Sequence, residues 1–220
     1  MFRPTFGRPA LARSAIALVA FMLTAFTFAD EPTATAPAAA PAAPPTDQAP
    51  KHSRVRIVTS MGTLVVELED ERAPLTVANF LGYVREGHYN GTTFHHVAVN
   101  FVAQGGGYTP DFKKKEAHAG VVNESGSGLR NTRGTIGMAR SDKNPHGAQA
   151  QFFFNLTDNP DLDPLPTRWG YAVFGHIVQG LDVLDRIGNV ATGAGGDFKE
   201  DVPLKPVIID KVELVSASAP

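Results

Sequence analysis

The sequence predicts a mostly-β domain that also contains two helices. Apolar and polar residues alternate over residues 55–57 and again over 64–68, with Met61-Gly62 between the two runs. Short runs of this kind, bounded by turn residues, are typical of antiparallel strands. Helical spacing begins at only two places, Pro74 and Gly180. Several short strands with two helices indicate a mostly-β fold class.

The first predicted helix begins at Pro74, because a proline at the first helical position gives up no hydrogen bond. Its apolar residues recur at i, i+3, i+4 and i+7 and form one buried stripe of Val77, Phe80, Leu81 and Val84. Gly87 ends this helix. The second helix is shorter, spans residues 180–187 and carries Leu181, Leu184 and Ile187.

The other apolar runs predict the remaining strands. The turn dipeptide Asn90-Gly91 leads into the stretch 93–107, whose β-branched and aromatic residues predict a strand that the glycines at 105–107 end. Further strands are expected at 134–138, 152–154, 173–174, 207–209 and 212–215.

The N-terminal region predicts export. Residues 1–29 combine three arginines, no acidic residue and a 14-residue apolar run, which indicates a secretory signal cleaved after Ala29. As a helix that run spans roughly 21 Å, less than the bilayer core of about 30 Å, although an uncleaved anchor stays an alternative. Residues 30–52 form an Ala/Pro-rich linker, residues 53–216 the domain and residues 217–220 a tail. We therefore expect a periplasmic protein.

Composition excludes several classes of function. A net charge of −2 over 220 residues gives no indication of nucleic acid or anionic lipid as a partner, and the absence of cysteine excludes thiol catalysis and disulfides. The polar stretch 108–132 contains Lys113-Lys114-Lys115, which we interpret as a solvated surface because acidic residues neighbour it. A stretch of this length within a compact domain is often functional.

Three sequence blocks carry a family resemblance. Phe94-His95-His96-Val97 followed by Phe101 and Gln104-Gly105-Gly106 resembles the Phe-His-Arg…Phe…Gln-Gly-Gly signature of the cyclophilins, the peptidyl-prolyl cis-trans isomerases. The blocks 134–140 with 151–155, and 162–163 with 171–175, follow in the family's order. The resemblance covers about residues 55–215 and is greatest to the bacterial periplasmic branch. It implies a closed eight-stranded antiparallel β-barrel capped by two α-helices, with the site on its outer face.

The reaction itself defines what such a site needs. Rotation about a peptide bond has a barrier of about 18–20 kcal/mol, because the nitrogen lone pair is delocalised into the carbonyl group. Lowering that barrier needs no nucleophile, metal or cofactor. The site must hold proline in an apolar slot and donate a hydrogen bond that localises the lone pair as the amide twists.

The resemblance assigns these tasks to particular residues. Phe101 and Phe153 would form the proline slot, which Val102, Leu162 and Tyr171 complete. Gln104 would bind the substrate backbone and Gln151 would line the adjoining groove. Ala139 and Arg140 match positions that pair with the substrate main chain. Asp161 takes a position where many eukaryotic members have tryptophan, which argues against tight cyclosporin binding. Without the family match, buried aromatic residues in strands would be interpreted as plain core.

His96 departs from the family pattern, because it occupies the position of the catalytic arginine. Arginine carries a permanent charge and a planar fork of donors, whereas histidine is shorter and has at most two. A hydrogen bond from a charged group contributes about 1.5–3 kcal/mol, so its loss at the transition state slows the reaction roughly 10- to 150-fold. We expect His95 not to replace it, because neighbours on a strand point to opposite faces. Arg140 is the other cationic side chain that the sequence leaves as a candidate for the role of the catalytic arginine.

Three functions are compatible with this sequence. The first is a prolyl isomerase, slowed and made pH-dependent by His96, that assists the folding of exported proteins. The second is a module that binds proline-containing peptides with little or no catalysis. The third, metal binding by His95 and His96, has no supporting ligand spacing. We expect a monomer whose partners are proline-containing peptides and unfolded exported proteins, with no stable membrane insertion once the signal is removed.

Overall fold

The computed structural model describes residues 52–215. The predicted signal segment 1–29, the tail 217–220 and all but the last residue of the predicted linker 30–52 lie outside the described residues, so these boundaries stay predictions. No helix within residues 52–215 is both long and apolar enough to cross a bilayer.

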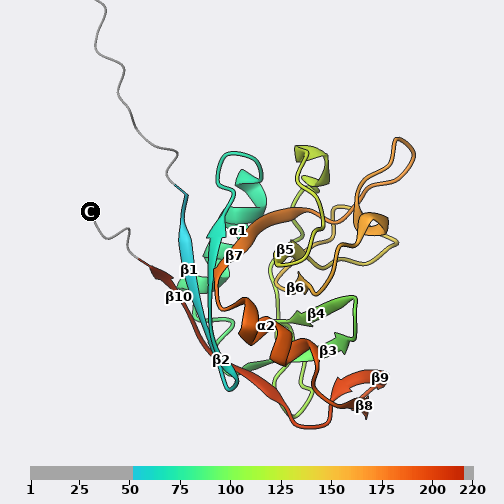
Figure 1. The fold of residues 1–220 in the computed structure, drawn as a ribbon. Coiled ribbons are helices and arrows are strands. Elements are labelled where there is room, and N and C mark those ends of the chain that lie inside the picture. Colours follow the sequence, from blue (N-terminus) through green and yellow to red (C-terminus); the bar gives the residue numbers. More distant parts are fainter. Residues whose placement is uncertain (1–51, 216–220) are drawn as a thin grey trace, which may run out of the picture. The chain divides into compact units, whose positions relative to one another are not determined.

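Eight strands close into an antiparallel barrel, which confirms the predicted architecture (Figure 1). Around the barrel the order is β1-β10-β3-β4-β6-β5-β7-β2. Their bounds are β1 (Arg54–Thr59), β2 (Gly62–Leu68), β3 (Thr92–Ala98), β4 (Val102–Gly105), β5 (Thr135–Met138), β6 (Phe152–Asn155), β7 (Val173–Gln179) and β10 (Val207–Val215). The predicted hairpin around Met61-Gly62 is the β1–β2 pair, with Ile57 opposite Leu64.

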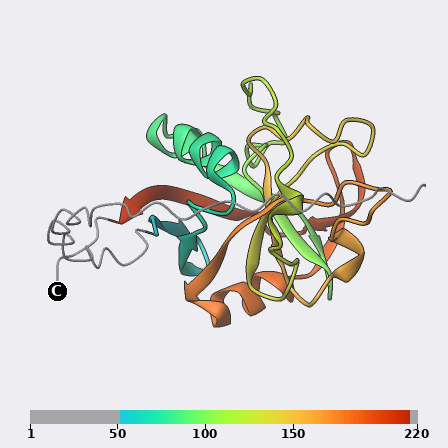
Figure 2. The ribbon, with the colours of Figure 1, turned by 90° about the horizontal axis from the view of Figure 1, so that it is seen from above.

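Two helices cover different sides of the barrel (Figure 2). Helix α1 (Pro74–Arg85) starts at the predicted proline and buries the predicted stripe, and α2 (Leu181–Gly188) buries Leu184 and Ile187. The residue before α1 has no side chain that could cap the helix. Instead the Glu124 carboxylate accepts hydrogen bonds from the Leu75 and Thr76 backbone N–H groups at 3.1 and 2.7 Å. The long loop 108–132 is thereby fixed to the helix.

The barrel interior is a packed aromatic core. Phe94, Phe152 and Phe154 are fully buried, and the rings of Phe152 and Phe154 meet edge-on with centroids 5.8 Å apart. Phe80 of α1 meets Phe152 in the same way, also at 5.8 Å. Side chains fill the interior, and the pleat therefore directs the alternate residues of β3, β4 and β6 to the outer face of the barrel.

The expected continuous strand through residues 93–104 is wrong, because the chain turns back at Val99-Asn100. Asn100 adopts the left-handed region with φ 57°, and the Phe101 N–H donates to the Ala98 carbonyl at 3.0 Å. Asparagine tolerates this conformation better than most residues. The stretch is thus the β3–β4 hairpin, and Phe101 lies at its tip rather than within a strand.

A second hairpin was not predicted from the sequence. Strands β8 (Thr192–Gly195) and β9 (Phe198–Pro203) form a separate two-stranded sheet that lies beside β3 (Figure 1). The sequence of β8, Thr-Gly-Ala-Gly, has almost no strand propensity. The hairpin is held by packing, since the Phe198 ring contacts His95 and Tyr108 with centroids 5.5 and 5.3 Å apart.

Candidate active site

A row of directly paired residues crosses the outer face of four neighbouring strands. His96 on β3 pairs with Gln104 on β4, Gln104 pairs with Phe153 on β6, and Phe153 pairs with Gly137 on β5. Directly paired residues on adjacent strands point to the same face of a sheet. Because the neighbouring Phe152 faces the core, this row faces outward, and it places three predicted site residues side by side.

Gly137 leaves space for the Phe153 ring. A Cβ atom at residue 137 would lie 2.5 Å from the ring carbon Cζ of Phe153, well inside van der Waals contact. The ring therefore lies over the backbone of β5, where only glycine leaves room for it. Phe153 also meets Tyr171 edge-on at 5.8 Å and is 3% exposed. The predicted wall of the proline slot is thus a fixed aromatic surface.

Phe101 supplies the exposed part of the slot, with 39% of its surface accessible, while the adjacent Val102 is 5% exposed. The Phe101 carbonyl accepts hydrogen bonds from the Leu156 N–H and the Asn159 side-chain amide, both at 2.9 Å. Leu162 follows in the short 3₁₀ helix η2 (Pro160–Leu162), and its carbonyl accepts the Tyr171 N–H at 2.8 Å. These contacts join Leu162 to Tyr171 and Tyr171 to Phe153, and the slot itself stays a prediction.

A buried polar network supports this part of the barrel and was not predicted from the sequence. Asn159 donates to Asn155 at 2.8 Å, Asn155 donates to Asn131 at 3.2 Å, and Asn131 donates to Asp163 at 3.0 Å. All four side chains are at most 7% exposed. Burial acts to raise the pKa of Asp163, but hydrogen bonds from Asn131 and Arg130 outweigh it and hold that pKa below its usual value. The network connects the Phe101 carbonyl to Asp163, the residue that follows η2.

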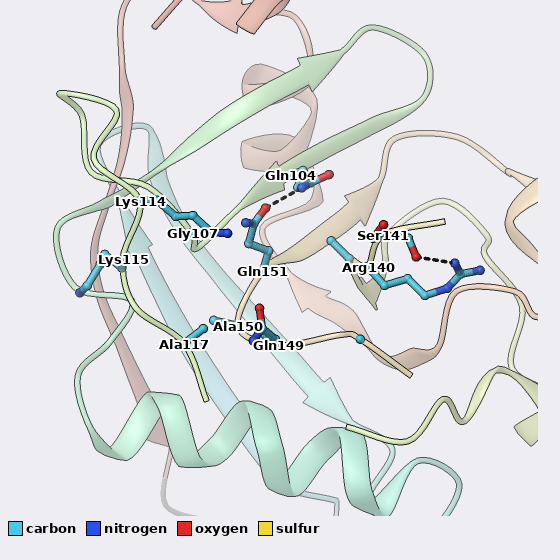
Figure 3. Close-up of a pocket in the computed structure, with 12 residues that line it drawn as sticks. Gln104, Gly107, Lys114, Lys115, Ala117, Arg140, Ser141, Gln149, Ala150 and Gln151 are labelled. Atoms are coloured by element: carbon cyan, nitrogen blue, oxygen red, sulfur yellow. Dashed lines mark hydrogen bonds between the residues drawn. The ribbon is translucent and has the colours of Figure 1, made fainter. Parts of the chain in front are cut away.

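Gln104 and Gln151 face each other beside the slot (Figure 3). The Gln104 amide donates to the Gln151 side-chain oxygen at 2.8 Å. Gly107 makes room for this pair, since a Cβ at that residue would lie 2.5 Å from the Gln151 side chain. The Ala139 N–H donates to the Gln151 carbonyl at 2.9 Å, and both residues line the same groove.

The Arg140 side chain extends away from the Gln104–Gln151 pair (Figure 3). Its guanidinium donates to the carbonyls of Trp169 and Gly170 at 2.9 and 3.2 Å and lies over the Tyr171 ring at 4.4 Å from the centroid. The side chain is 5% exposed. The hypothesis that Arg140 replaces the missing arginine therefore has no support in this geometry. Arg140 instead fixes the loop that leads into Tyr171.

Strict alternation along β3 is interrupted at His95, because the β3–β4 register shifts between Phe94 and His96. Phe94 enters the core, whereas His95 packs against Tyr108 with ring centroids 4.6 Å apart. Burial lowers the pKa of the His95 imidazole to about 4, and repulsion from neighbouring His96 adds to the shift. His95 is 2% exposed and its Nδ1 has no hydrogen-bond partner within residues 52–215. It is thus neutral and covered, whereas His96 is half-buried.

Asp161 lies exposed in η2, beside the half-buried Leu162. Its backbone carbonyl accepts a hydrogen bond from Arg168 at 2.7 Å. Within residues 52–215, no group of three or more His, Cys, Asp or Glu side chains is arranged to hold a metal ion. The arrangement as a whole offers an apolar slot, a row of neutral amide groups and one imidazole on the outer wall of a barrel, which suits an uncharged peptide segment.

Comparisons with known proteins agree with this geometry. Residues 54–214 match the family model described as "Cyclophilin type peptidyl-prolyl cis-trans isomerase/CLD". The chain is 48% identical over 166 residues to "Peptidyl-prolyl cis-trans isomerase cyp18" of Streptomyces antibioticus, which covers 74% of this chain and 99% of the relative. It is also 48% identical over 157 residues to "Peptidyl-prolyl cis-trans isomerase B" of Escherichia coli K12, covering 70% of this chain and 94% of the relative.

A solved structure shows the same fold. The cyclophilin type peptidyl-prolyl cis-trans isomerase of Cryptosporidium parvum, determined in the presence of the dipeptide Ala-Pro, is 27% identical with a TM-score of 0.63. The match covers 74% of this chain and 99% of that chain. The fold is a β-barrel of the cyclophilin class. The chain belongs to the family of cyclophilin-type peptidyl-prolyl cis-trans isomerases. The bacterial periplasmic branch within that family stays a prediction.

Proposed function

We propose that this isomerase assists the folding of exported proteins and that His96 takes the part of the family's arginine. The observation that carries the proposal is the outward row of His96, Gln104 and Phe153 on three adjacent strands. Phe153 with Phe101 would hold the proline ring. Gln104 would bind the peptide backbone. His96 would donate a hydrogen bond toward the prolyl amide as that amide twists.

Two observations favour His96 over its neighbours as the donor. Arg140 has its guanidinium occupied by the Trp169 and Gly170 carbonyls, and His95 is almost completely buried. His96 is half-buried and lies directly opposite Gln104. An imidazole has fewer donors than a guanidinium, so we expect a slower reaction.

The proposed location outside the cytoplasmic membrane is supported by the N-terminal sequence. Arginines followed by an apolar run in residues 1–29 are typical of a secretory signal, and an Ala/Pro-rich linker follows. Exported proteins that must change the isomer of an X–Pro bond refold slowly, because uncatalysed isomerisation takes tens of seconds or longer. An isomerase beyond the membrane would remove that delay. The substrates would be proline-containing segments of unfolded exported proteins.

In a second candidate function, the protein retains the proline slot but has no isomerase activity. This function is favoured by the same departure, since His96 stands where the family has arginine and Arg140 does not replace it. In that case the protein binds proline-containing peptides and protects unfolded chains without accelerating isomerisation. The Ala-Pro dipeptide named for the Cryptosporidium parvum cyclophilin supports a proline-peptide ligand for either candidate.

A protease-coupled assay with a proline-containing peptide separates the two candidates. We expect the parent to turn the peptide over slowly. His96→Arg should be roughly 10- to 150-fold faster near neutral pH.

Phe101→Ala is the matched loss-of-slot control and should weaken both binding and turnover. A parent that binds the peptide and shows no turnover would favour the binding module. An already fast parent with no gain in His96→Arg would contradict the role given to His96. The proposed client class is tested by refolding an exported protein whose folding is limited by proline isomerisation. The parent should accelerate this refolding.

A further inference from the structure

His95 forms a bulge in β3, directly before the proposed donor His96. Phe94 pairs with Gly105 on β4. The next pair joins His96 to Gln104, so β3 advances two residues where β4 advances one, and His95 is the extra residue. An extra residue of this kind bends its strand and re-aims the side chain beside it. The direction of the His96 imidazole therefore depends on how His95 is held.

Backbone pairing does not hold the bulge on the other edge of β3. The ladder between β3 and β10 joins residues 92–94 to residues 207–209 and ends before the bulge. The element that lies beside β3 there is the β8–β9 hairpin, which belongs to a separate two-stranded sheet (Figure 1). On this edge, the bulge is therefore held by side-chain packing against the hairpin.

Three rings pack together at the bulge. The His95 ring centroid lies 4.6 Å from that of Tyr108 and 5.5 Å from that of Phe198, and Tyr108 meets Phe198 edge-on at 5.3 Å. These contacts close a triangle that leaves His95 only 2% exposed. The His95 Nδ1 atom has no hydrogen-bond partner in the described part of the chain, so ring packing rather than a bond at that atom orients the side chain.

The Phe198 ring is itself fixed, because the hairpin that carries it is held by Phe112. A Cβ atom at Gly196 would lie 2.7 Å from the Phe112 ring, and a Cβ atom at Gly195 would lie 2.9 Å from it. The Phe112 ring therefore lies directly on the hairpin turn, where only glycine leaves room for it. Phe112 also packs against Phe198 with ring centroids 6.4 Å apart. The hairpin thus presents the Phe198 ring to the bulge at a fixed position.

We propose that Phe198 is a positioning residue for the isomerase reaction, because it holds the His95 bulge and thereby aims the His96 imidazole at the prolyl amide. The inference rests on the proposed function, since that function makes His96 the donor. Removing the Phe198 ring leaves a cavity on one side of His95, into which the bulge relaxes. A displacement of about 1 Å costs a reacting group up to about 100-fold in rate, so a partial displacement of His96 should cost about ten-fold in kcat.

The first test compares the turnover of a proline-containing peptide by Phe198→Ala and Val202→Ala. Val202 is the matched control, because it lies on the same strand, is 4% exposed and packs against the hairpin at Gly195. Phe198→Ala should lower kcat about ten-fold and leave KM within about two-fold, since the predicted slot is formed by other residues. Val202→Ala should keep kcat within about two-fold of the parent. Phe198→Leu keeps part of the ring volume, serves if Phe198→Ala does not fold, and should lower kcat about three-fold.

The second test observes the His96 ring directly, through the carbon–proton NMR signals of the histidine side chains. His96→Ala identifies the signal by removing it. The parent and Val202→Ala should show one sharp His96 signal, whereas Phe198→Ala and Phe198→Leu should broaden or split it, because the imidazole then exchanges between orientations.

The two proposals fail separately. The positioning role would be overturned by parental kcat in the Phe198 variants, by an equal loss of kcat in Val202→Ala, or by an unchanged His96 signal in the Phe198 variants. A parent that turns no peptide over overturns the proposed function alone. The NMR comparison then decides the positioning role, since a broadened or split signal in the Phe198 variants supports it and an unchanged signal overturns it.

Discussion

Gly137→Ala tests whether the proline slot depends on the Phe153 ring lying over β5. The added Cβ would lie 2.5 Å from Cζ of Phe153 and 3.0 Å from both Cε atoms. Ordinary carbon–carbon contact is about 3.5–4.0 Å, so the ring must move by about 1 Å or more. Overpacking of this size costs about 1–3 kcal/mol of stability. A displacement of about 1 Å in a positioning group costs up to about 100-fold in rate.

Two measurements check this prediction. Urea unfolding should show a lower midpoint with an unchanged slope, and the protease-coupled assay should show a lower kcat/KM. Gly82→Ala is the control, because nothing lies within 4 Å of its added Cβ and it belongs to α1. It should gain about 0.5–1 kcal/mol and keep full turnover. Gly137→Ala with parental stability and parental kcat/KM would refute the packing argument.

Other predictions concern the buried groups around the slot. Asn159→Ala removes the donor that holds the Phe101 carbonyl at 2.9 Å. It should lower the free energy of unfolding by about 1–3 kcal/mol and raise KM more than it lowers kcat. An unchanged KM would contradict the positioning role. His95 has a native pKa of about 4 against an ordinary 6.5, so the unfolded chain binds more protons between these values and stability falls as the pH decreases from 6.5 to 4. The resulting loss of stability is about 3 kcal/mol at pH 4 and disappears above pH 6.5. His95→Phe should lack it in urea unfolding at pH 7 and pH 4, and equal losses in parent and variant would refute it.

Much of the fold is predictable because its local patterns agree with the final packing. The alternation in residues 55–68 and the stripe of α1 are both seen in the structure. The expected strand through 93–104 failed because one residue, Asn100, reverses the chain, and runs of β-branched and aromatic residues conceal such a turn. The β8–β9 hairpin was missed for the opposite reason. Its stability comes from contacts with His95 and Tyr108, which are distant in sequence.

The candidate site was predictable only in part. The slot residues follow from the family resemblance alone. The groups that hold them in place carry no local signal, because a buried asparagine such as Asn155 looks like any polar residue in the sequence. The same holds for Gly137, whose role depends on a ring from another strand.

The most direct test of the central claim is NMR exchange spectroscopy on a proline-containing peptide, with the parent and with His96→Ala. The account predicts that the parent transfers magnetisation between the cis and trans peptide signals, because the imidazole stabilises the twisted amide. His96→Ala should bind the peptide with an affinity within about three-fold of the parent and lose most of this exchange. Exchange as fast in His96→Ala as in the parent would contradict the account.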